Sequence, residues 1–225
     1  MQFSINDYSK NPQAKGWGPG WPHDNSDKMV NIKANKSGKR VNVHRRIGRL
    51  SDILLDEIER RGHQIRMLGG YNNRQIFKNG KPTGRPSNHS WGLAIDLNWD
   101  KNPETRDGKV HTDVPEWMQD LFNRFGFAWG GDYRSGGHRD PMHFEFMGSP
   151  ADADKMTAKA VKEILQHKAA PPAAATYTVK DGDTLSGIAG KFRVAGGWQK
   201  LFQLNRKVIG SNPDVIKPGQ VLVLR

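Results

Sequence analysis

The feature that most restricts how this chain can fold is KAAPPAAAT, residues 168–176. Its prolines and alanines have no apolar period, which is typical of an extended, semi-rigid linker and not of a helix or a strand. A chain of 225 residues is long enough for one full-sized domain and a second, small one. We therefore expect a larger domain at residues 43–167 and a smaller one at residues 177–225, joined by this linker.

The larger domain is preceded by residues 1–42, which are rich in Gly, Pro, Asn and Lys. This composition predicts an irregular arm with a few aromatic anchors, which we count as part of the larger domain. Beyond the arm, apolar residues at spacings of three and four predict helices. The predicted elements are a helix from Val43 to Gly62 with its apolar face at Ile47, Leu50, Leu54 and Ile58, a strand at 64–68, a helix from the capping-box pair Asp113 and Glu116 to Gly126, and a helix that starts at Ser149 and Pro150.

Charge and composition limit the partners and the chemistry. Lys and Arg exceed Asp and Glu by 35 to 23, a formal net charge of +12, which favours nucleic acid, an anionic membrane or an acidic polymer such as the bacterial cell wall. The chain has no cysteine, so a metal ion would be held by His, Asp or Glu. No apolar run approaches the roughly 20 residues of a membrane span, and the first residues lack the pattern of a secretory signal. We expect a protein that is made in the cytoplasm and has no membrane span.

Two segments together contain the groups of a catalytic metal site. SNHSWGLAIDLN holds His89 and Asp96, and DPMHFEF holds Asp140 and His143. A catalytic zinc ion uses three protein ligands and leaves one position for water, and a carboxylate outside the ligand set takes the proton of that water. Gly92 allows the chain to turn back towards His89, and both segments are predicted as adjacent strands. We expect the four groups to meet there.

The segments SNHSWGLAIDLN and GGDYRSGGHRDPMHFEF resemble, in order, the two signature segments of the VanY-type zinc peptidases, the D-alanyl-D-alanine carboxypeptidase-like family that includes many phage endolysins. The resemblance extends over about residues 43–150. It implies an α+β fold with a small antiparallel sheet and flanking helices, and one catalytic zinc ion. The implied roles are zinc ligation by His89, Asp96 and His143, activation of water by Asp140 as general base, stabilisation of the oxyanion by Arg74, and positioning of the substrate by Ser87 and Tyr71.

Four neighbours are left outside these roles. His138 is the main competitor as a ligand, but it lies in a Gly-rich loop. Glu145 shares a strand face with His143 and is expected to orient a ligand without binding zinc. Trp129 and Asp132, in WGGDY, either line the site or belong to a tight turn, and the glycine pair favours the turn.

Residues 177–225 resemble a LysM module over their whole length, with YTVKDGDTLSGIA at the start and NPDVIKPGQVLVL at the end. The pattern predicts strand, helix, helix and strand, with a core at Leu185, Ile188, Phe192, Trp198, Leu201 and Leu204. The family binds N-acetylglucosamine-containing glycans, and the resemblance implies glycan contacts at Gly182, Asp183, Thr184, Leu185, Asn212, Pro213 and Ile216. The module carries 8 Lys or Arg and 3 Asp, a balance of +5, which suits an anionic cell wall.

The two resemblances together imply a peptidoglycan hydrolase of the phage endolysin kind. It would cut a stem-peptide bond, of the L-Ala-D-Glu or the terminal D-Ala-D-Ala type, act as a monomer and bind no nucleic acid. Made in the host cytoplasm, it would reach the wall after a holin opens the membrane. Two alternatives stay open. One is a metal-dependent nuclease, which the charge of +12 and the seven Trp would also suit; the other is a non-catalytic wall-binding protein whose zinc is structural.

Overall fold

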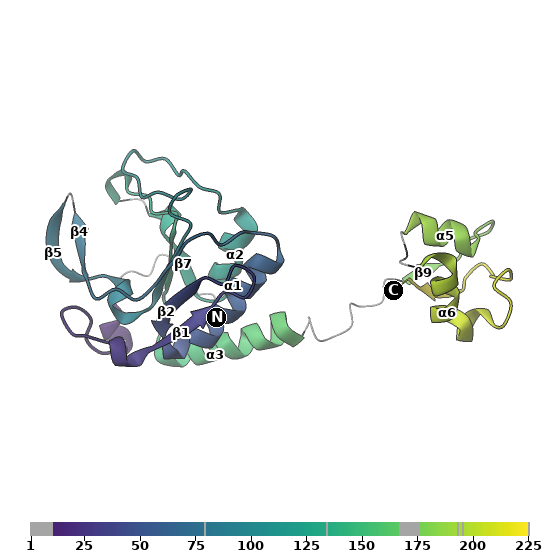
Figure 1. Cartoon of the computed structure of the whole chain (residues 1–225), viewed down its shortest axis with the longest axis horizontal. Helices are drawn as coiled ribbons and strands as arrows, with labels where there is room; N and C mark the ends of the chain where they lie inside the picture. Colours follow the sequence, from purple (N-terminus) through teal and green to yellow (C-terminus); the bar gives the residue numbers. More distant parts are fainter. Residues whose placement is uncertain are drawn as a thin grey trace. The chain divides into compact units, whose positions relative to one another are not determined.

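The computed structural model describes residues 11–78, 80–133, 135–166, 176–192, 194 and 196–224. The chain forms two compact units, Met1–Leu165 and Gln166–Arg225, which we call the N-terminal and C-terminal units (Figure 1). Most of the predicted linker, residues 168–175, lies outside the described residues. Each unit combines helices with small antiparallel sheets, so the expected α+β class is confirmed. Within the described residues, no helix is both long and apolar enough to cross a bilayer.

The N-terminal unit is built around a four-stranded antiparallel sheet in the order β3-β6-β8-β7, with two separate two-stranded hairpins, β1-β2 and β4-β5. Its strands are β1 (Met29–Lys33), β2 (Arg40–His44), β3 (Leu68–Gly69), β4 (Gln75–Lys78), β5 (Lys81–Pro86), β6 (Ala94–Leu97), β7 (Phe127–Trp129) and β8 (His143–Phe146). Its longer helices are α1 (Arg45–Arg60), α2 (Glu116–Arg124) and α3 (Pro150–Ala160), the last continued by the π-helical turn η6 (Val161–Leu165). The short 3-10 helices are η1 (Gln13–Lys15), η2 (Ser26–Lys28), η3 (Asn88–Trp91), η4 (Gly130–Asp132) and η5 (Ser135–Gly137).

The first long helix, α1, packs its apolar face into the main core. The four positions predicted for that face are fully buried, which confirms it. The helix begins at Arg45 and not at Val43, because Val43 belongs to β2 and the His44 side chain caps the helix. Gly62, just beyond the end of the helix, has φ +94°, as expected of a residue that ends a helix.

The prediction of an irregular arm at residues 1–42 is wrong where β1 and β2 form. These strands pair as an antiparallel hairpin, with Ile32 and Val43 buried against the core. The outward positions of the hairpin are occupied by Asn and Lys, which are uncommon in strands. The alternation of apolar and polar residues that indicates a strand was therefore difficult to recognise in the sequence. Before the hairpin, Trp17 anchors the arm: its ring is buried, and its Nε1 donates to the Gly148 carbonyl oxygen at 2.8 Å.

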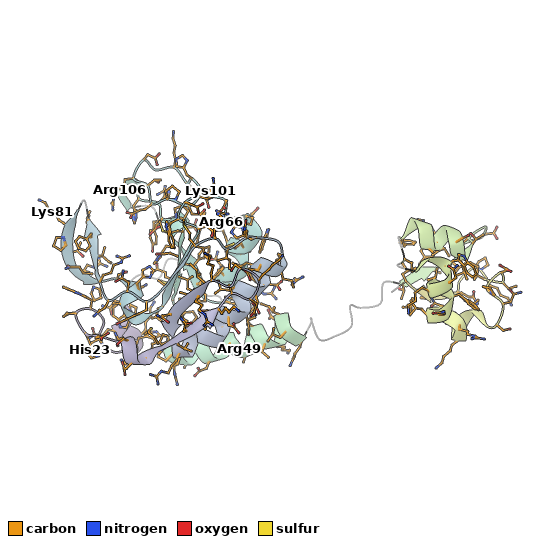
Figure 2. All side chains as sticks on the ribbon, viewed as in Figure 1. His23, Arg49, Arg66, Lys81, Lys101 and Arg106 are labelled. Carbon is orange, nitrogen blue, oxygen red and sulfur yellow. The ribbon has the colours of Figure 1, made fainter. Side chains whose placement is uncertain are left out.

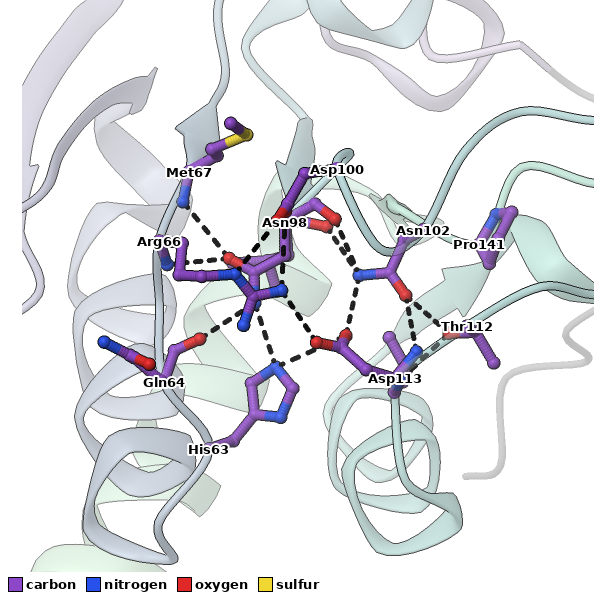
Figure 3. A network of polar contacts seen from close by, with 12 residues as sticks. His63, Gln64, Arg66, Met67, Asn98, Asp100, Asn102, Thr112, Asp113 and Pro141 are labelled. Carbon is purple, nitrogen blue, oxygen red and sulfur yellow. Dashed lines mark hydrogen bonds and ion pairs between the residues drawn. The ribbon is translucent and has the colours of Figure 1, made fainter.

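The capping box predicted at Asp113 is also wrong. Helix α2 begins after Pro115 with no side-chain cap. The Asp113 carboxylate instead accepts hydrogen bonds from Asn102 at 2.9 Å and from Arg66 at 2.8 Å (Figure 3). Asn98, directly after β6, is buried with φ +51°, and its Oδ1 accepts the Arg66 N–H at 2.7 Å. This polar network fixes the chain at the end of β6.

Two other boundaries follow from local hydrogen bonds. The strand predicted at 64–68 is reduced to Leu68–Gly69, because the two residues before it donate their N–H groups to the Asn98 side chain. Helix α3 begins as predicted, since Ser149 is its N-cap and Asp152 completes a capping box.

A buried carboxylate near the end of α1 predicts an acid-sensitive contribution to stability. Glu57 is buried and accepts hydrogen bonds from Arg60 and Arg61 at 2.6 to 2.7 Å. Burial alone would raise the pKa of Glu57, but these bonds outweigh it and lower the pKa from 4.5 to about 2. The stabilisation is therefore complete above pH 4.5 and is lost as the pH falls towards 2.

We expect Glu57→Gln to lower the free energy of unfolding by about 1–2 kcal/mol at neutral pH, since solvent screens the two half-exposed guanidinium groups. Urea titrations of both proteins from neutral pH down to pH 2.5 measure this difference. The difference should shrink as the pH falls below 4.5. A constant difference would contradict the assignment.

The C-terminal unit has the predicted order of strand, helix, helix and strand. Its elements are β9 (Thr176–Thr178), α5 (Leu185–Lys191), α6 (Gly197–Ile209) and β10 (Val221–Val223), and β9 pairs antiparallel with β10. The predicted core is confirmed at Leu185, Ile188 and Leu201. It is wrong for three residues that are 39–40% exposed: Phe192, Trp198 and Leu204. So small a unit has too little chain to cover the outer side of α6, which carries Trp198 and Leu204, or the end of α5 at Phe192.

Candidate metal centre

Three side chains from separate elements converge beside the central strands of the N-terminal unit. His89 comes from η3, Asp96 from β6 and His143 from β8. His89 Nε2 lies 3.2 Å from Asp96 Oδ2 and 3.2 Å from His143 Nδ1, and His143 Nδ1 lies 2.9 Å from Asp96 Oδ1. One possible ligand atom from each residue lies within 4.8 Å of the other two. The structure thus brings together the three residues predicted as ligands, and the group could hold one metal ion.

The backbone explains this convergence. Asp96 and His143 are direct partners in the ladder between β6 and β8, so their side chains leave the sheet side by side on the same face. Gly92, with φ +67°, ends η3 and turns the chain into β6. Ser87 caps η3, and its Oγ accepts the His89 N–H at 3.4 Å. The capped helix η3 therefore positions His89, and the paired strands β6 and β8 position Asp96 and His143.

Contacts on the far side of each ring leave one nitrogen of each histidine facing the centre. His89 Nδ1 donates to the Gly70 carbonyl oxygen at 2.6 Å, which leaves Nε2. His143 Nε2 lies 3.5 Å from Glu145 Oε2, which leaves Nδ1. Such outer contacts fix the ring orientation and the tautomer of metal-binding histidines. Two imidazole nitrogens and one carboxylate are the donor set of a catalytic zinc site with an open position, so the residues present fit zinc.

The electrostatics of the centre favour a bound positive charge. His89 is 2% and His143 is 7% exposed. Burial raises the pKa of Asp96, but hydrogen bonds with the two histidines outweigh it and hold that pKa far below its usual value. Burial lowers the pKa of His143, and the carboxylates of Asp96 and Glu145 outweigh it and raise that pKa well above 6.5. The groups of Asp96 and His143 that share a proton here would bind a metal cation in its place.

Further contacts hold Glu145, whose Oε2 lies 3.5 Å from His143 Nε2. The Tyr133 hydroxyl donates to Glu145 Oε1 at 2.7 Å, and the Asn88 side-chain amide donates to Glu145 Oε2. Tyr133 and Asn88 are not among the residues predicted from the sequence. Alternation along β8 shows that His143 and Glu145 share a face, but nothing in the sequence shows which distant side chains reach Glu145.

Asp140, the predicted general base, lies in the loop before β8. Its Oδ1 is buried and has no hydrogen-bond partner among the described residues. Burial raises the pKa of Asp140 above its usual 3.8. The Asp140 N–H donates to the Gly130 carbonyl oxygen at 2.9 Å, and a Cβ added to Gly130 would lie 2.3 Å from the Asp140 carbonyl oxygen. The close approach of these two loops therefore requires glycine at position 130.

Ser87 and Tyr71, predicted to position substrate, adjoin the centre and use their hydroxyls in other contacts. The Ser87 hydroxyl caps the helix of His89. The Tyr71 hydroxyl donates to the Asp24 carboxylate and accepts the Asn25 N–H at 3.0 Å, which fastens the amino-terminal arm. Their contacts with substrate stay predictions.

Arg74 lies at the base of the β4–β5 hairpin. Its carbonyl oxygen accepts the Ser87 N–H at 3.1 Å. Its guanidinium donates to the adjacent Gln75 carbonyl oxygen at 3.5 Å and forms no ion pair with a carboxylate of the described residues. These contacts leave most of the guanidinium N–H groups of Arg74 available to bind an oxyanion. The predicted role of Arg74 stays a prediction.

The remaining neighbours do not join the centre. His138 Nε2 lies 3.1 Å from Glu104 Oε1, outside the converging group. Trp129 is buried and its Nε1 donates to the Pro141 carbonyl oxygen at 2.8 Å, a packing role. Asp132 ends the short helix η4, in agreement with the predicted turn.

The stretch of chain that holds this centre matches a known family. Residues 81–146 match the family model described as D-alanyl-D-alanine carboxypeptidase, and they include the three converging residues and Asp140. Residues 177–225 match the family model described as LysM domain. The chain therefore contains a segment similar to the D-alanyl-D-alanine carboxypeptidases, followed by a segment similar to LysM domains.

A curated relative is similar over a shorter stretch. The potassium binding protein Kbp of Escherichia coli O6:H1 (strain CFT073) is 48% identical over 60 residues, which cover 25% of this chain and 40% of that protein. The chain therefore spans about two fifths of the length of this relative. No solved structure matches the chain.

In the LysM domain, the residues predicted to contact glycan differ in how free their side chains are. Asp183 accepts hydrogen bonds from the Tyr177 hydroxyl and the Lys180 N–H, both at 2.8 Å. Thr184 caps α5, and Leu185 is buried in the core. Ile216 packs partly buried against the same core. The others are Gly182 and Asn212, which are exposed, and Pro213, which is half-buried. Because the Leu185 side chain is buried, only the backbone of this residue could contact a glycan.

The contacts of Glu145 predict its effect on zinc affinity in the peptidase. We expect Glu145→Gln to weaken zinc binding about 10- to 100-fold, because the His143 ring loses its charged partner. Tyr133→Phe should weaken it less, since it removes one hydrogen bond from Glu145. Competition with a chromophoric chelator measures both. Tyr177→Phe, which makes the same chemical change in the LysM domain, is the control, and equal zinc affinity in all four proteins would contradict this role.

Proposed function

We propose that this protein is a zinc-dependent peptidoglycan hydrolase of the phage endolysin kind that cleaves a peptide bond of the stem peptide. The peptidase and LysM matches support a peptidase that binds peptidoglycan. The main support for the finer assignment is the convergence of His89, Asp96 and His143 within 4.8 Å of one another. The buried carboxyl of Asp140, in the loop that leads into β8, supplies the further acid–base group that such a reaction needs.

The zinc ion would be held by His89 Nε2, the Asp96 carboxylate and His143 Nδ1. When bound, zinc supplies a Lewis acid that makes a water molecule nucleophilic at neutral pH. The chain keeps both rings in the required orientation through the Gly70 carbonyl oxygen and the Glu145 carboxylate. This preorganisation spares the protein any rearrangement of the ligands when substrate arrives.

Asp140 is the proposed proton carrier. Its unpartnered Oδ1 accepts the proton of the attacking water while the water oxygen bonds to the carbonyl carbon of the scissile amide. The carbon–nitrogen bond then breaks, and Asp140 returns the proton to the leaving amine. Because burial raises its pKa, Asp140 is a stronger base than an exposed aspartate and serves in both steps.

Arg74 is the proposed partner of the carbonyl oxygen. Its guanidinium carries several N–H donors and is not neutralised by a described carboxylate. Donors aimed at the negative charge that develops on that oxygen would lower the barrier to attack. Ser87 and Tyr71 are proposed to position the peptide nearby.

The LysM domain is proposed to hold the enzyme on the glycan strands. Attachment to an insoluble polymer raises the effective concentration of stem peptides without adding contacts at the catalytic centre. The enzyme would act as a monomer on the cell wall after release from the host cytoplasm.

Digestion of purified peptidoglycan tests the proposal. Mass spectrometry of the fragments released by the zinc-loaded protein should show a new terminus within the stem peptide, at the L-Ala-D-Glu bond or at the terminal D-Ala-D-Ala bond. Intact sacculi, together with degradation of DNA in magnesium, would refute the proposal and favour a nuclease.

A further inference from the structure

The hairpin of β4 and β5 extends from the peptidase away from its core (Figure 1). The described residues from Ile76 to Arg85 are all exposed, and Phe77 is 51% exposed. A two-stranded hairpin is at best marginally stable on its own. Its exposed apolar side chains therefore gain little by folding alone, and a bound partner would cover them.

The charges of this hairpin point to the chemistry of that partner. Lys78 and Lys81 face each other as direct cross-strand partners, a placement of like charges that destabilises a strand pair. Arg85 adds a third positive charge, and residues 67–95 contain no Asp or Glu. None of the three cations has an ion pair with a described carboxylate. Figure 2 shows Lys81 at the outer end of the hairpin.

The hairpin also grows out of the segment that holds a metal ligand. At its base, the Ser87 N–H donates to the Arg74 carbonyl oxygen at 3.1 Å. The Asn72 N–H donates to the His89 carbonyl oxygen at 3.2 Å, and the Ser87 hydroxyl caps the short helix of His89. A ligand that lies along the hairpin would therefore continue into the metal centre.

We propose that the β4–β5 hairpin binds the acidic part of the stem peptide, with Lys78, Lys81 and Arg85 holding its carboxylates while the bond to be cut lies at the metal centre. The proposal rests on the proposed function and adds the group that recognises the substrate. The strands rise by about 3.3 Å per residue, so the four residues of β4 extend over about 13 Å, the length of an extended peptide of about four residues. Ile76, two residues before Lys78 and therefore on the same face of β4, offers apolar contact to an alanine methyl group of such a peptide.

Binding to an inactive protein tests this without any need for catalysis. The full-length, zinc-loaded Asp140→Asn protein is titrated by calorimetry with a stem tetrapeptide that has free carboxylates and with the same peptide after amidation of its carboxylates. Adding Lys78→Glu and Lys81→Glu should weaken binding of the acidic peptide about tenfold and leave the amidated peptide unchanged. Lys78→Arg with Lys81→Arg keeps the charge and should restore the affinity.

The matched control reverses two lysines on the other hairpin. Lys33 and Lys39 are exposed near the turn between β1 and β2, so Lys33→Glu with Lys39→Glu makes the same change in net charge away from the β4–β5 hairpin. Equal affinities in the two reversed proteins would overturn the proposal. An equal loss for the acidic and amidated peptides would also overturn it, because charge recognition would not be the cause. If the wild-type enzyme fails to hydrolyse peptidoglycan while this charge-dependent binding persists, the proposed function fails and the hairpin assignment stands.

Discussion

Asp140→Asn should abolish hydrolysis of peptidoglycan while leaving zinc binding and binding to cell walls unchanged. The substitution keeps the shape of the side chain but removes the group that accepts a proton, at a position where Oδ1 is buried without a partner among the described residues. Loss of a general base costs about 10²- to 10⁴-fold in turnover. Turnover of a stem peptide, zinc content by elemental analysis and retention on sacculi measure the three quantities separately.

Two companion variants make this result specific. Asp120→Asn makes the same chemical change at an exposed position of α2 and should keep wild-type turnover. Asp140→Glu retains a carboxylate on a longer arm and should recover part of the activity, as expected of a proton carrier. If Asp140→Asn lysed walls as fast as the wild type, the carboxylate would have no catalytic part, and a structural zinc in a wall-binding protein would be the better account.

Local patterns in the sequence predicted the centre because its geometry depends on short-range rules. Alternation along β6 and β8 places Asp96 and His143 on accessible faces, and Gly92 permits the turn that brings His89 back. The two segments were predicted as adjacent strands, and the ladder between β6 and β8 aligns Asp96 directly with His143.

The contacts that hold the centre could not be predicted, because they join side chains to groups on other elements of the fold. Gly70 binds His89 from 19 residues away, and Tyr133 reaches Glu145 from a loop beyond β7. Neither follows from spacing or propensity. Asp113 has a helix-capping sequence, yet it binds Arg66 and Asn102 because tertiary partners outweigh a local preference. In the LysM domain, Trp198 has the helical spacing of a core residue but lies 39% exposed, because the small unit leaves that side of α6 uncovered.

Removing the metal should abolish hydrolysis and also destabilise the peptidase. His89 Nε2 and His143 Nδ1 lie 3.2 Å apart beside Asp96, so the folded chain has already gathered a ligand set that the unfolded chain lacks. An ion that binds only the folded state at a free concentration 1,000-fold above its Kd adds about 4 kcal/mol to the free energy of unfolding. For a unit of this size that corresponds to roughly 10 °C in Tm. Calorimetric scans before and after dialysis against a chelator, and again after zinc is restored, measure the shift.

Asp96→Asn separates the effect of the metal from that of the chelator. The amide is a poor zinc ligand, so this variant should show no rise in Tm when zinc is added and no hydrolysis at any zinc concentration. The transition of the LysM domain should stay constant throughout, because its fold contains none of the three ligands. Full activity in protein that elemental analysis shows to be free of bound metal would remove the basis for catalysis by this centre. A rise in Tm with zinc but without hydrolysis would instead assign the three residues to a structural site.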